Sequence, residues 1–275
     1  MYGAILGDII GSPYEFDRGD KTTKFPLFNK ESCHTDDTVM TIAVADALMS
    51  CYKRTDDEIK HELVKSMQKW GKKYPNAGYG QMFYQWLRIK DPQPYGSFGN
   101  GSAMRVSSVG WLYNSLEETR KIARLTAEVS HNHPEGIKGA EATASAIWMA
   151  RCGYSKTSIG DYIIDEFDYD LSRTCDELRP LHEHIETCQD SMPKALAAFF
   201  EGENFEDVIR LAISLGGDTD TIACIAGSIA EAYYGIPQEI IDEAKKLGLI
   251  PRDMLAILDR FDRRLTCLEV CDADN

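Results

Sequence analysis

Two short segments combine carboxylates with hydroxyl groups, and each stands at the start of an apolar run. The first, His34–Thr38, reads His-Thr-Asp-Asp-Thr, and the second, Gly216–Thr221, reads Gly-Gly-Asp-Thr-Asp-Thr. Helix capping explains one acid and one threonine in each, because side-chain oxygens accept hydrogen bonds from free N–H groups at a helix N-terminus. It does not explain the second acid, since unpaired carboxylates at the mouth of a buried helix repel each other and lose their solvation.

Neither acidic segment has a lysine or arginine close to it in the sequence, so metal ions are the cations that would offset the charge. Four carboxylates with threonine hydroxyls form an all-oxygen donor set, which suits Mg²⁺, Mn²⁺ or Ca²⁺ rather than Zn²⁺. If the two helices lie side by side, their N-termini would hold two cations about 3.5–4 Å apart. We therefore expect a site for two divalent cations, with helix capping as the simpler alternative for either segment alone.

Other segments carry polar groups that suit ligand binding. Gly99–Arg105 is glycine-rich and leads into an apolar run, so its N–H groups could cradle a phosphate, although by itself a turn with a helix cap is the simpler interpretation. The Ser130–Gly136 loop offers imidazole and amide groups for sugar hydroxyls or phosphates, a use that we favour over metal binding by its two histidines. His182–His184 lies in a charged, poorly patterned stretch and is interpreted as solvated surface.

Glu15 follows the N-terminal apolar segment and stands between Tyr14 and Phe16. An isolated glutamate on a loop is usually solvated, but these aromatic neighbours favour partial burial or a position on a lid. Tyr79 and Phe98 lie in glycine-containing loops, where either ring could stack on a planar base.

The elements that must position these groups are helices. Apolar residues recur at helical spacing along most of the chain, whereas the alternation typical of strands is scarce. The predicted helices cover Thr38–Met49, Glu58–Trp70, Leu116–Ser130, Glu135–Ala150, Pro193–Phe200, Phe205–Leu215, Thr219–Tyr234 and Arg252–Leu265. Without a linker or an internal repeat, we predict an all-α fold over residues 1–275: a single compact orthogonal bundle of many helices.

Two of these helices differ from the others because they are small and apolar nearly all round. Residues 38–48 and 221–232 have this composition, which predicts burial at the centre of a bundle. The first apolar segment carries Gly3, Gly7 and Gly11 along one helical face. Glycine lowers helix stability, so this stripe predicts that a neighbouring backbone approaches closely.

Composition excludes several classes of protein. The 275 residues include 44 Asp and Glu against 30 Lys and Arg, a net charge of −14 that disfavours binding to nucleic acid or an acidic membrane. The eight cysteines form no C-x-x-C pair, and no apolar stretch is long enough to cross a membrane. The N-terminus lacks the basic start of a signal peptide. We expect a reduced, cytoplasmic protein that is a monomer.

Five segments, in this order, closely resemble the ADP-ribosylglycohydrolase family. The resemblance extends from about Met1 to Tyr234, and although each motif alone is weak, their ordered combination is specific. The segments are Gly7–Gly11 with Glu15, Thr35–Thr38, Gly99–Arg105, Ser130–Asn132 and Gly216–Thr221.

The resemblance implies an all-α enzyme with two Mg²⁺ or Mn²⁺ ions that hydrolyses the bond between ADP-ribose and an acceptor. The positions that match metal ligands of the family are Thr35, Asp36, Asp37, Asp218, Asp220 and Thr221. Glu15 matches a mobile acid that is catalytic in the serine-linkage branch, and either Glu15 or Asp218 is the expected general base. Expected substrate contacts are the diphosphate loop Gly99, Asn100, Gly101 and Ser102, then His131, Phe98, Gly78, Tyr79 and Gly80.

The expected substrate is ADP-ribosylated arginine on a protein. The alternatives within the class are serine-linked ADP-ribose, O-acetyl-ADP-ribose or another small ADP-ribosyl conjugate. The alternatives from other classes are a non-catalytic ADP-ribose-binding module and a structural Ca²⁺ protein. Some arginine-linkage members carry an additional acid that Gly71–Gly80 lacks, and residues 154–190 match no family motif.

Overall fold

The structure, a computed structural model, describes residues 1–16, 21–51, 54–181 and 183–273, with side chains described as far as residue 267. This part of the chain contains no β-strand, only an isolated antiparallel bridge between Gly99 and Thr187. The helices are α1 (Tyr2–Gly11), η1 (Ser12–Tyr14), α2 (Asp36–Ser50), α3 (Asp56–Lys73), α4 (Gln81–Trp86), α5 (Gly101–Met104), α6 (Val109–Leu112), α7 (Leu116–Glu128), α8 (Pro134–Arg151), α9 (Lys156–Phe167), α10 (Cys175–Leu178), η2 (Arg179–Leu181), α11 (Cys188–Glu201), α12 (Phe205–Ser214), α13 (Thr219–Tyr234), α14 (Gln238–Lys246) and α15 (Arg252–Ala273).

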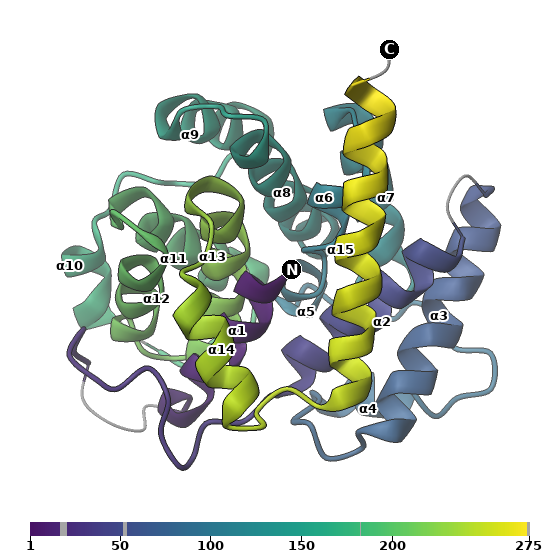
Figure 1. Cartoon of the computed structure of the whole chain (residues 1–275), viewed down its shortest axis with the longest axis horizontal. Helices are drawn as coiled ribbons and strands as arrows, with labels where there is room; N and C mark the ends of the chain where they lie inside the picture. Colours follow the sequence, from purple (N-terminus) through teal and green to yellow (C-terminus); the bar gives the residue numbers. More distant parts are fainter. Residues whose placement is uncertain (17–20, 52–53, 182, 274–275) are drawn as a thin grey trace.

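Helices α1, α2 and α13 form the buried centre, and the other helices surround them (Figure 1). Every residue of α1 is buried, as are residues 37–48 of α2 and 219–230 of α13. For α2 and α13 this confirms the prediction from their nearly uniform apolar composition. The N-terminus lies near the middle of the molecule, where the α-amino group of Met1 forms a 2.8 Å ion pair with Glu231 of α13.

The glycine stripe of α1 lies directly against α13, which confirms the predicted close approach. A Cβ atom added at Gly7 would stand 2.1 Å from the carbonyl oxygen of Ala223, and one at Gly3 would stand 2.2 Å from that of Gly227. At Gly11 it would meet the Cα atom of Asp220 at 2.6 Å. Only glycine permits this backbone contact, which brings the C-terminal end of α1 to the acidic start of α13.

Helix α11 begins at Cys188, well before the predicted start at Pro193, so that prediction is wrong at its N-terminal end. Proline is favoured in the first turn, but it is also accommodated here inside the helix, where it removes one backbone hydrogen bond. The helix begins earlier because the carbonyl of Thr187 accepts a bond from the N–H of Ser191. Helices α9 and α14 were not predicted; each buries only a narrow apolar face, such as Ile240, Ile241 and Ala244 of α14.

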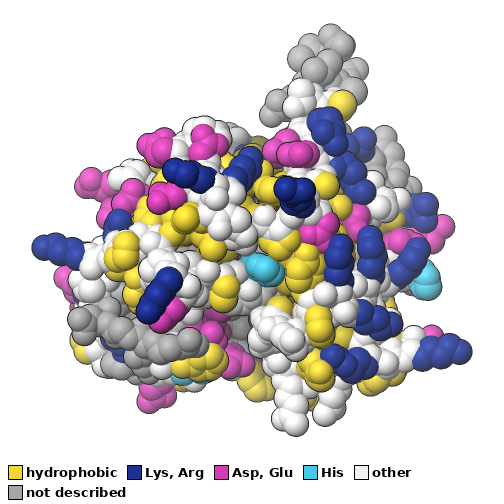
Figure 2. Space-filling view, turned by 60° about the horizontal axis from the view of Figure 1, so that its bottom comes forward, with side chains coloured by type: hydrophobic (Ala, Val, Ile, Leu, Met, Phe, Trp, Pro, Cys, Tyr) yellow, Lys and Arg dark blue, Asp and Glu magenta, His cyan; other side chains and the backbone are white. Residues whose placement is uncertain are grey.

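Charge is distributed unevenly over the surface. Lys and Arg side chains gather on the right of Figure 2, the side that α3 occupies in Figure 1. Five lysines belong to α3 alone: Lys60, Lys65, Lys69, Lys72 and Lys73. The same helix also carries Asp56, Asp57, Glu58 and Glu62, so this side is not purely basic. Among the helices described, none has the length and apolar character required to cross a bilayer.

Candidate active site

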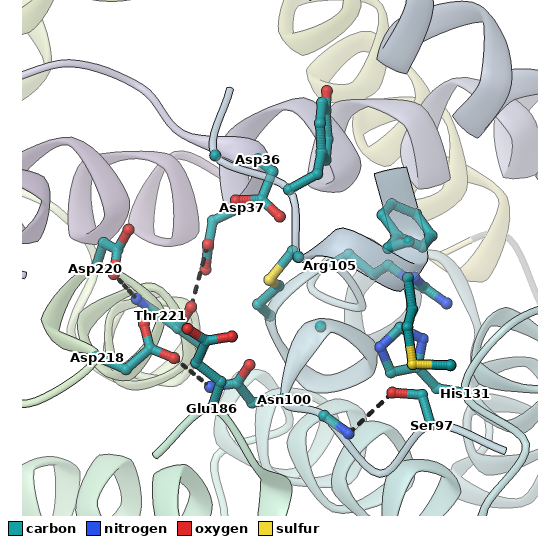
Figure 3. Close-up of a pocket in the computed structure, with 18 of the residues that line it drawn as sticks. Asp36, Asp37, Ser97, Asn100, Arg105, His131, Glu186, Asp218, Asp220 and Thr221 are labelled. Atoms are coloured by element: carbon teal, nitrogen blue, oxygen red, sulfur yellow. Dashed lines mark hydrogen bonds between the residues drawn. The ribbon is translucent and has the colours of Figure 1, made fainter. Parts of the chain in front are cut away.

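A cavity of about 500 Å³ opens where the N-termini of α2 and α13 meet the loop before α5. Its two ends differ in charge: Figure 3 shows the carboxylates at one end, and Arg105 with His131 at the other. The lining residues that the sequence predicted are Glu15, Asp36, Asp37, Gly78, Tyr79, Gly80, Gly99, Asn100, Gly101, His131, Asp218, Asp220 and Thr221. Those that it missed are Phe16, Gln81, Met82, Phe83, Tyr95, Ser97, Met104, Arg105 and Glu186.

The carboxylates form two groups that share one member. In the first, oxygen atoms of Asp8, Asp37 and Asp220 lie within 4.8 Å of one another. In the second, the same holds for Glu15, Asp218 and Asp220. Asp220 therefore stands between the groups, at the first turn of α13. Residues far apart in the sequence meet here because the glycine stripe seats α1 on α13 and because α2 begins beside them.

The chemistry of these groups fits hard divalent cations. Oδ1 of Asp37 is buried and has no hydrogen-bond partner among the described residues. Burial raises the pKa of Asp37 and Asp220 well above the usual range, and neighbouring carboxylates raise it further. Asp36 shows the same effect, with burial first and then Asp8 and Asp218 as causes. An all-oxygen set of this kind suits Mg²⁺ or Mn²⁺, whose charge offsets the repulsion.

Asp8 was missed as a site residue, although it organises the start of α2. Its Oδ2 accepts hydrogen bonds from the backbone N–H groups of Thr35 (2.9 Å) and Thr38 (3.0 Å) and from the Thr38 hydroxyl. Its Oδ1 accepts the Thr35 hydroxyl at 2.7 Å. A carboxylate from another helix thus caps α2 and complements its dipole. The sequence signal was an acid within an otherwise apolar segment.

Asp8→Asn is expected to lower the free energy of unfolding by about 2–4 kcal/mol, since one capping oxygen becomes an NH₂ group that faces donors. The loss is expected even though the change removes a negative charge from the cluster. Urea denaturation of the cation-free protein measures it, with exposed Asp165→Asn of α9 as the matched control. Equal stability of the two variants would contradict the capping role.

Two side-chain contacts fix the remaining acids. The Asn100 amide donates to Oδ2 of Asp218 at 2.6 Å, and its nitrogen also lies 2.7 Å from the Ser191 hydroxyl. The hydroxyl of Thr221 donates to Oδ2 of Asp37 at 3.1 Å, which connects α13 to α2 (Figure 3). The glycine loop is therefore joined directly to the acidic end of the cavity.

The loop around Gly99–Gly101 also reaches the ring of His131, and it offers backbone donors there. The N–H of Gly99 donates a hydrogen bond to the hydroxyl of Ser97, and the N–H of Asn100 donates one to the carbonyl of Glu186. The backbone N–H groups of Gly101 and Ser102 have no hydrogen-bond acceptor within the described part of the chain. These donors suit an anionic group of a ligand.

Aromatic rings line the side of the cavity. Tyr79 lies beside Phe83, with ring centroids 6.1 Å apart, and Tyr95 lies 5.9 Å from the ring of His131. Gly78 has a φ of +100°, and a Cβ atom there would stand 3.5 Å from Oδ1 of Asp36. This left-handed conformation favours glycine at the point where the aromatic wall meets the carboxylates.

The structure does not bring three of the predicted site residues to the cavity wall. The hydroxyl of Thr35 donates a hydrogen bond to Asp8 and accepts one from the N–H of Asp37. Phe98 is 46% exposed and contacts the ring of His133, so its side chain does not offer a stacking platform inside the cavity. The Ser102 hydroxyl donates to the carbonyl of Gly136 in the interior, leaving only its backbone N–H for a ligand.

The segment interpreted as solvated surface lies in part at the cavity rim. His184 packs on Phe16, with ring centroids 4.5 Å apart, and lies 2.9 Å from Glu186, which lines the cavity. His182 lies outside the described residues. Nothing in the local pattern predicted this, because the segment is placed by the tertiary bridge between Gly99 and Thr187.

Comparison with known proteins is consistent with this geometry. The sequence matches the ADP-ribosylglycohydrolase family over residues 1–268. ADP-ribosylhydrolase ARH3 of Mus musculus is 28% identical, with 86% of this chain and 83% of the relative covered. ADP-ribosylarginine hydrolase Tri1 of Pseudomonas putida is 26% identical, with 86% of this chain and 70% of the relative covered. A solved ADP-ribosylglycohydrolase-related protein complex shares the fold, with a TM-score of 0.65, 22% identity and coverage of 96% of this chain and 92% of that chain. The predicted all-α fold is confirmed.

Proposed function

The chain belongs to the ADP-ribosylglycohydrolase family, and from this premise we propose that it is a divalent-cation-dependent hydrolase that releases ADP-ribose from modified arginine side chains of proteins. The observation that carries the proposal is the polarity of the cavity. One end holds two groups of carboxylates that share Asp220, and the other holds backbone donors with Arg105 and His131. ADP-ribose has the complementary division, because its distal ribose carries hydroxyls and its diphosphate carries negative charge.

In this arrangement the glycine loop binds the diphosphate, and the aromatic wall receives the adenine. The distal ribose is then directed towards Asp36, Asp37 and Asp218. As the bond to the acceptor breaks, the anomeric carbon gains positive charge, which nearby carboxylates stabilise. A general base takes a proton from the attacking water as the oxygen bonds to the anomeric carbon; the proton then passes to the leaving acceptor nitrogen, which regenerates the base. Glu15 and Asp218 are the candidates for the base.

Asp8, Asp37 and Asp220 would hold one cation, and Glu15, Asp218 and Asp220 the other. When bound, the cations would supply Lewis-acid polarisation and would lower the pKa of water in the site. The chain orients these ligands itself: Asn100 holds Asp218, and Thr221 holds Asp37.

The acids at the cavity favour a cationic acceptor. Glu186 and Asp36 line the cavity but belong to neither of the two carboxylate groups that would hold cations. A guanidinium group is planar and carries a delocalised positive charge, so carboxylates complement it well. The relative named ADP-ribosylarginine hydrolase supports this choice.

Serine-linked ADP-ribose is the second candidate, and the position of Glu15 favours it. Its carboxylate lies with those of Asp218 and Asp220, at the end of the cavity where the acceptor bond is expected. An alkoxide leaving group requires a proton donor there, a role that a glutamate can take. Gly71–Gly80 also lacks the acid that some arginine-linkage members carry.

The candidate substrates are distinguished by measuring ADP-ribose release from arginine-, serine- and acetyl-linked conjugates. Chelator-treated protein is assayed alone, with Mg²⁺ and with Mn²⁺. The proposal predicts cation-dependent release that is fastest from arginine. Faster release from serine selects the second candidate, and no release from any conjugate contradicts hydrolase activity.

Glu15→Gln is expected to lower kcat by about 10²-fold or more, within the range for loss of a general acid–base group. Binding of ADP-ribose at saturating Mg²⁺ is expected to change less than kcat, because the glycine loop and the aromatic wall are untouched and Asp218 and Asp220 remain to hold the cation that Glu15 would share. Steady-state kinetics and a titration with ADP-ribose measure the two effects, with exposed Glu243→Gln of α14 as the control. An unchanged kcat would exclude Glu15 as the base.

A further inference from the structure

Arg105 is a completely buried cation in the cavity wall. It is 0% exposed, and its Nη2 donates to the carbonyl of Thr126 at 2.7 Å and to the hydroxyl of Ser130 at 2.9 Å. Nε and Nη1 have no hydrogen-bond partner in the described part of the chain. Buried arginines are normally paired with carboxylates, so this placement needs an explanation.

The burial has an electrostatic consequence. It lowers the pKa of Arg105 to about 10, so the guanidinium remains charged near neutral pH. The ring of His131 is buried next to it, and burial, followed by the charge of Arg105, lowers the pKa of His131 well below its usual value. The imidazole is therefore neutral, with a single proton on one of its two nitrogens.

The neighbouring hydroxyl determines which nitrogen carries that proton. Ser130 is fully buried, and its Oγ accepts from Arg105, which can only donate. Its other partner is Nδ1 of His131 at 2.8 Å. If Nδ1 carried the proton, the serine proton would be left unpaired in the interior, at a substantial cost. The serine therefore donates to Nδ1, and the proton of the imidazole lies on Nε2.

Nε2 faces the glycine loop. A Cβ atom added at Gly101 would stand 3.0 Å from it, and one at Gly99 would stand 3.6 Å from it. The hydrogen bonds thus run in one direction, from Arg105 through Ser130 to His131, and end in a donor beside the loop. Figure 3 shows Arg105 and His131 side by side at this end of the cavity.

We propose that Arg105 and Ser130 are positioning residues that hold His131 as a neutral Nε2–H donor for a diphosphate bound at the Gly99–Gly101 loop. The identity of the ligand rests on the proposed function; the proton position does not. A donor fixed in this way is useful in a cavity rich in carboxylates, because it recognises an acceptor oxygen without reorientation of the ring.

The first test is made on the free, full-length protein. Nitrogen NMR of ¹⁵N-histidine-labelled protein distinguishes the two neutral tautomers and the imidazolium. We expect the His131 signals of the Nε2–H tautomer throughout about pH 5.5–8, a range that spans the usual histidine pKa. In Ser130→Ala the tautomers are expected to mix. A protonated Nδ1 in the unaltered protein would overturn the proposal.

The second test measures ADP-ribose binding by calorimetry in the presence of Mg²⁺. Ser130→Ala is expected to weaken binding about tenfold, the effect of one well-placed hydrogen bond. The matched control is Ser145→Ala, because Ser145 is equally buried in α8 and its hydroxyl has no partner among the described residues. The affinity of the Ser145→Ala variant for ADP-ribose is expected to equal that of the unaltered protein.

A double-mutant cycle separates positioning from a general structural effect. In a His131→Ala background, Ser130→Ala is expected to have no further effect on affinity. A further tenfold loss in that background would overturn the proposal, because Ser130 would then act independently of His131. If the unaltered protein has the Nε2–H tautomer but does not bind ADP-ribose, the proposed function fails while the assignment of the proton stands.

Discussion

Asp220→Asn is expected to lower kcat/KM by about 10³-fold or more, at the upper end of what removing one catalytic polar group costs. Asp220 is the residue that both carboxylate groups share, so its loss weakens both cation sites at once. The same change is expected to raise the melting temperature of the cation-free protein. Its carboxylate is repelled by Asp218 and Asp37, and an amide of the same size removes that repulsion.

The opposite signs of these two effects make the prediction specific. Activity is measured with saturating Mg²⁺ or Mn²⁺, and thermal unfolding is followed with and without each ion. In the unaltered protein, the cation is expected to raise the melting temperature by mass action; in Asp220→Asn this increase disappears. Asp165→Asn serves again as the control. Full activity, or a cation-induced increase equal to that of the unaltered protein, would contradict the role of Asp220.

Gly7→Ala is expected to lower the free energy of unfolding by about 3 kcal/mol or more, at or beyond the upper end of typical overpacking. The new methyl group would meet backbone atoms of α13, which cannot rotate away as a side chain can. Relief requires α1 to move off α13. Because α1 carries Asp8 and leads directly to Glu15, the variant is also expected to lose most of its cation-dependent stabilisation.

Gly160→Ala provides the matched control in a helix interior. A Cβ atom there makes ordinary contacts, the nearest at 3.5 Å from Phe200. Alanine favours a helix over glycine by about 1 kcal/mol, so this variant is expected to be more stable than the unaltered protein. Chemical denaturation of both variants measures the contrast. If Gly7→Ala were as stable as Gly160→Ala, the glycine stripe would not set the approach of α1 to α13.

The parts of the fold that local physics determines were predicted well. The spacing of small apolar residues gave Thr219–Tyr234 with both ends correct, because an acidic start and a following glycine mark it. The Gly3–Gly7–Gly11 stripe predicted a close helix contact, but a pattern in one segment cannot identify its partner. The contact with α13 is a property of the folded chain.

The site was predictable where the chemistry lies in contiguous motifs and not where it depends on tertiary contacts. Asp8 accepts a hydrogen bond from the backbone of Thr35, 27 residues later in the chain, and no local sequence pattern predicts such a contact. Glu186 reaches the cavity because the backbone around it pairs with the Gly99 loop. Arg105 was within a recognised motif, but its burial against Ser130 is visible only in three dimensions.

Hydrolase activity, as proposed here, requires that two carboxylate groups sharing Asp220 hold two divalent cations. Calorimetric titration of Mn²⁺ into chelator-treated protein tests it most directly. We expect two bound ions per chain, with both sites weakened together in Asp220→Asn. Binding of no ion, or of ions whose affinity is unchanged by that substitution, would contradict it.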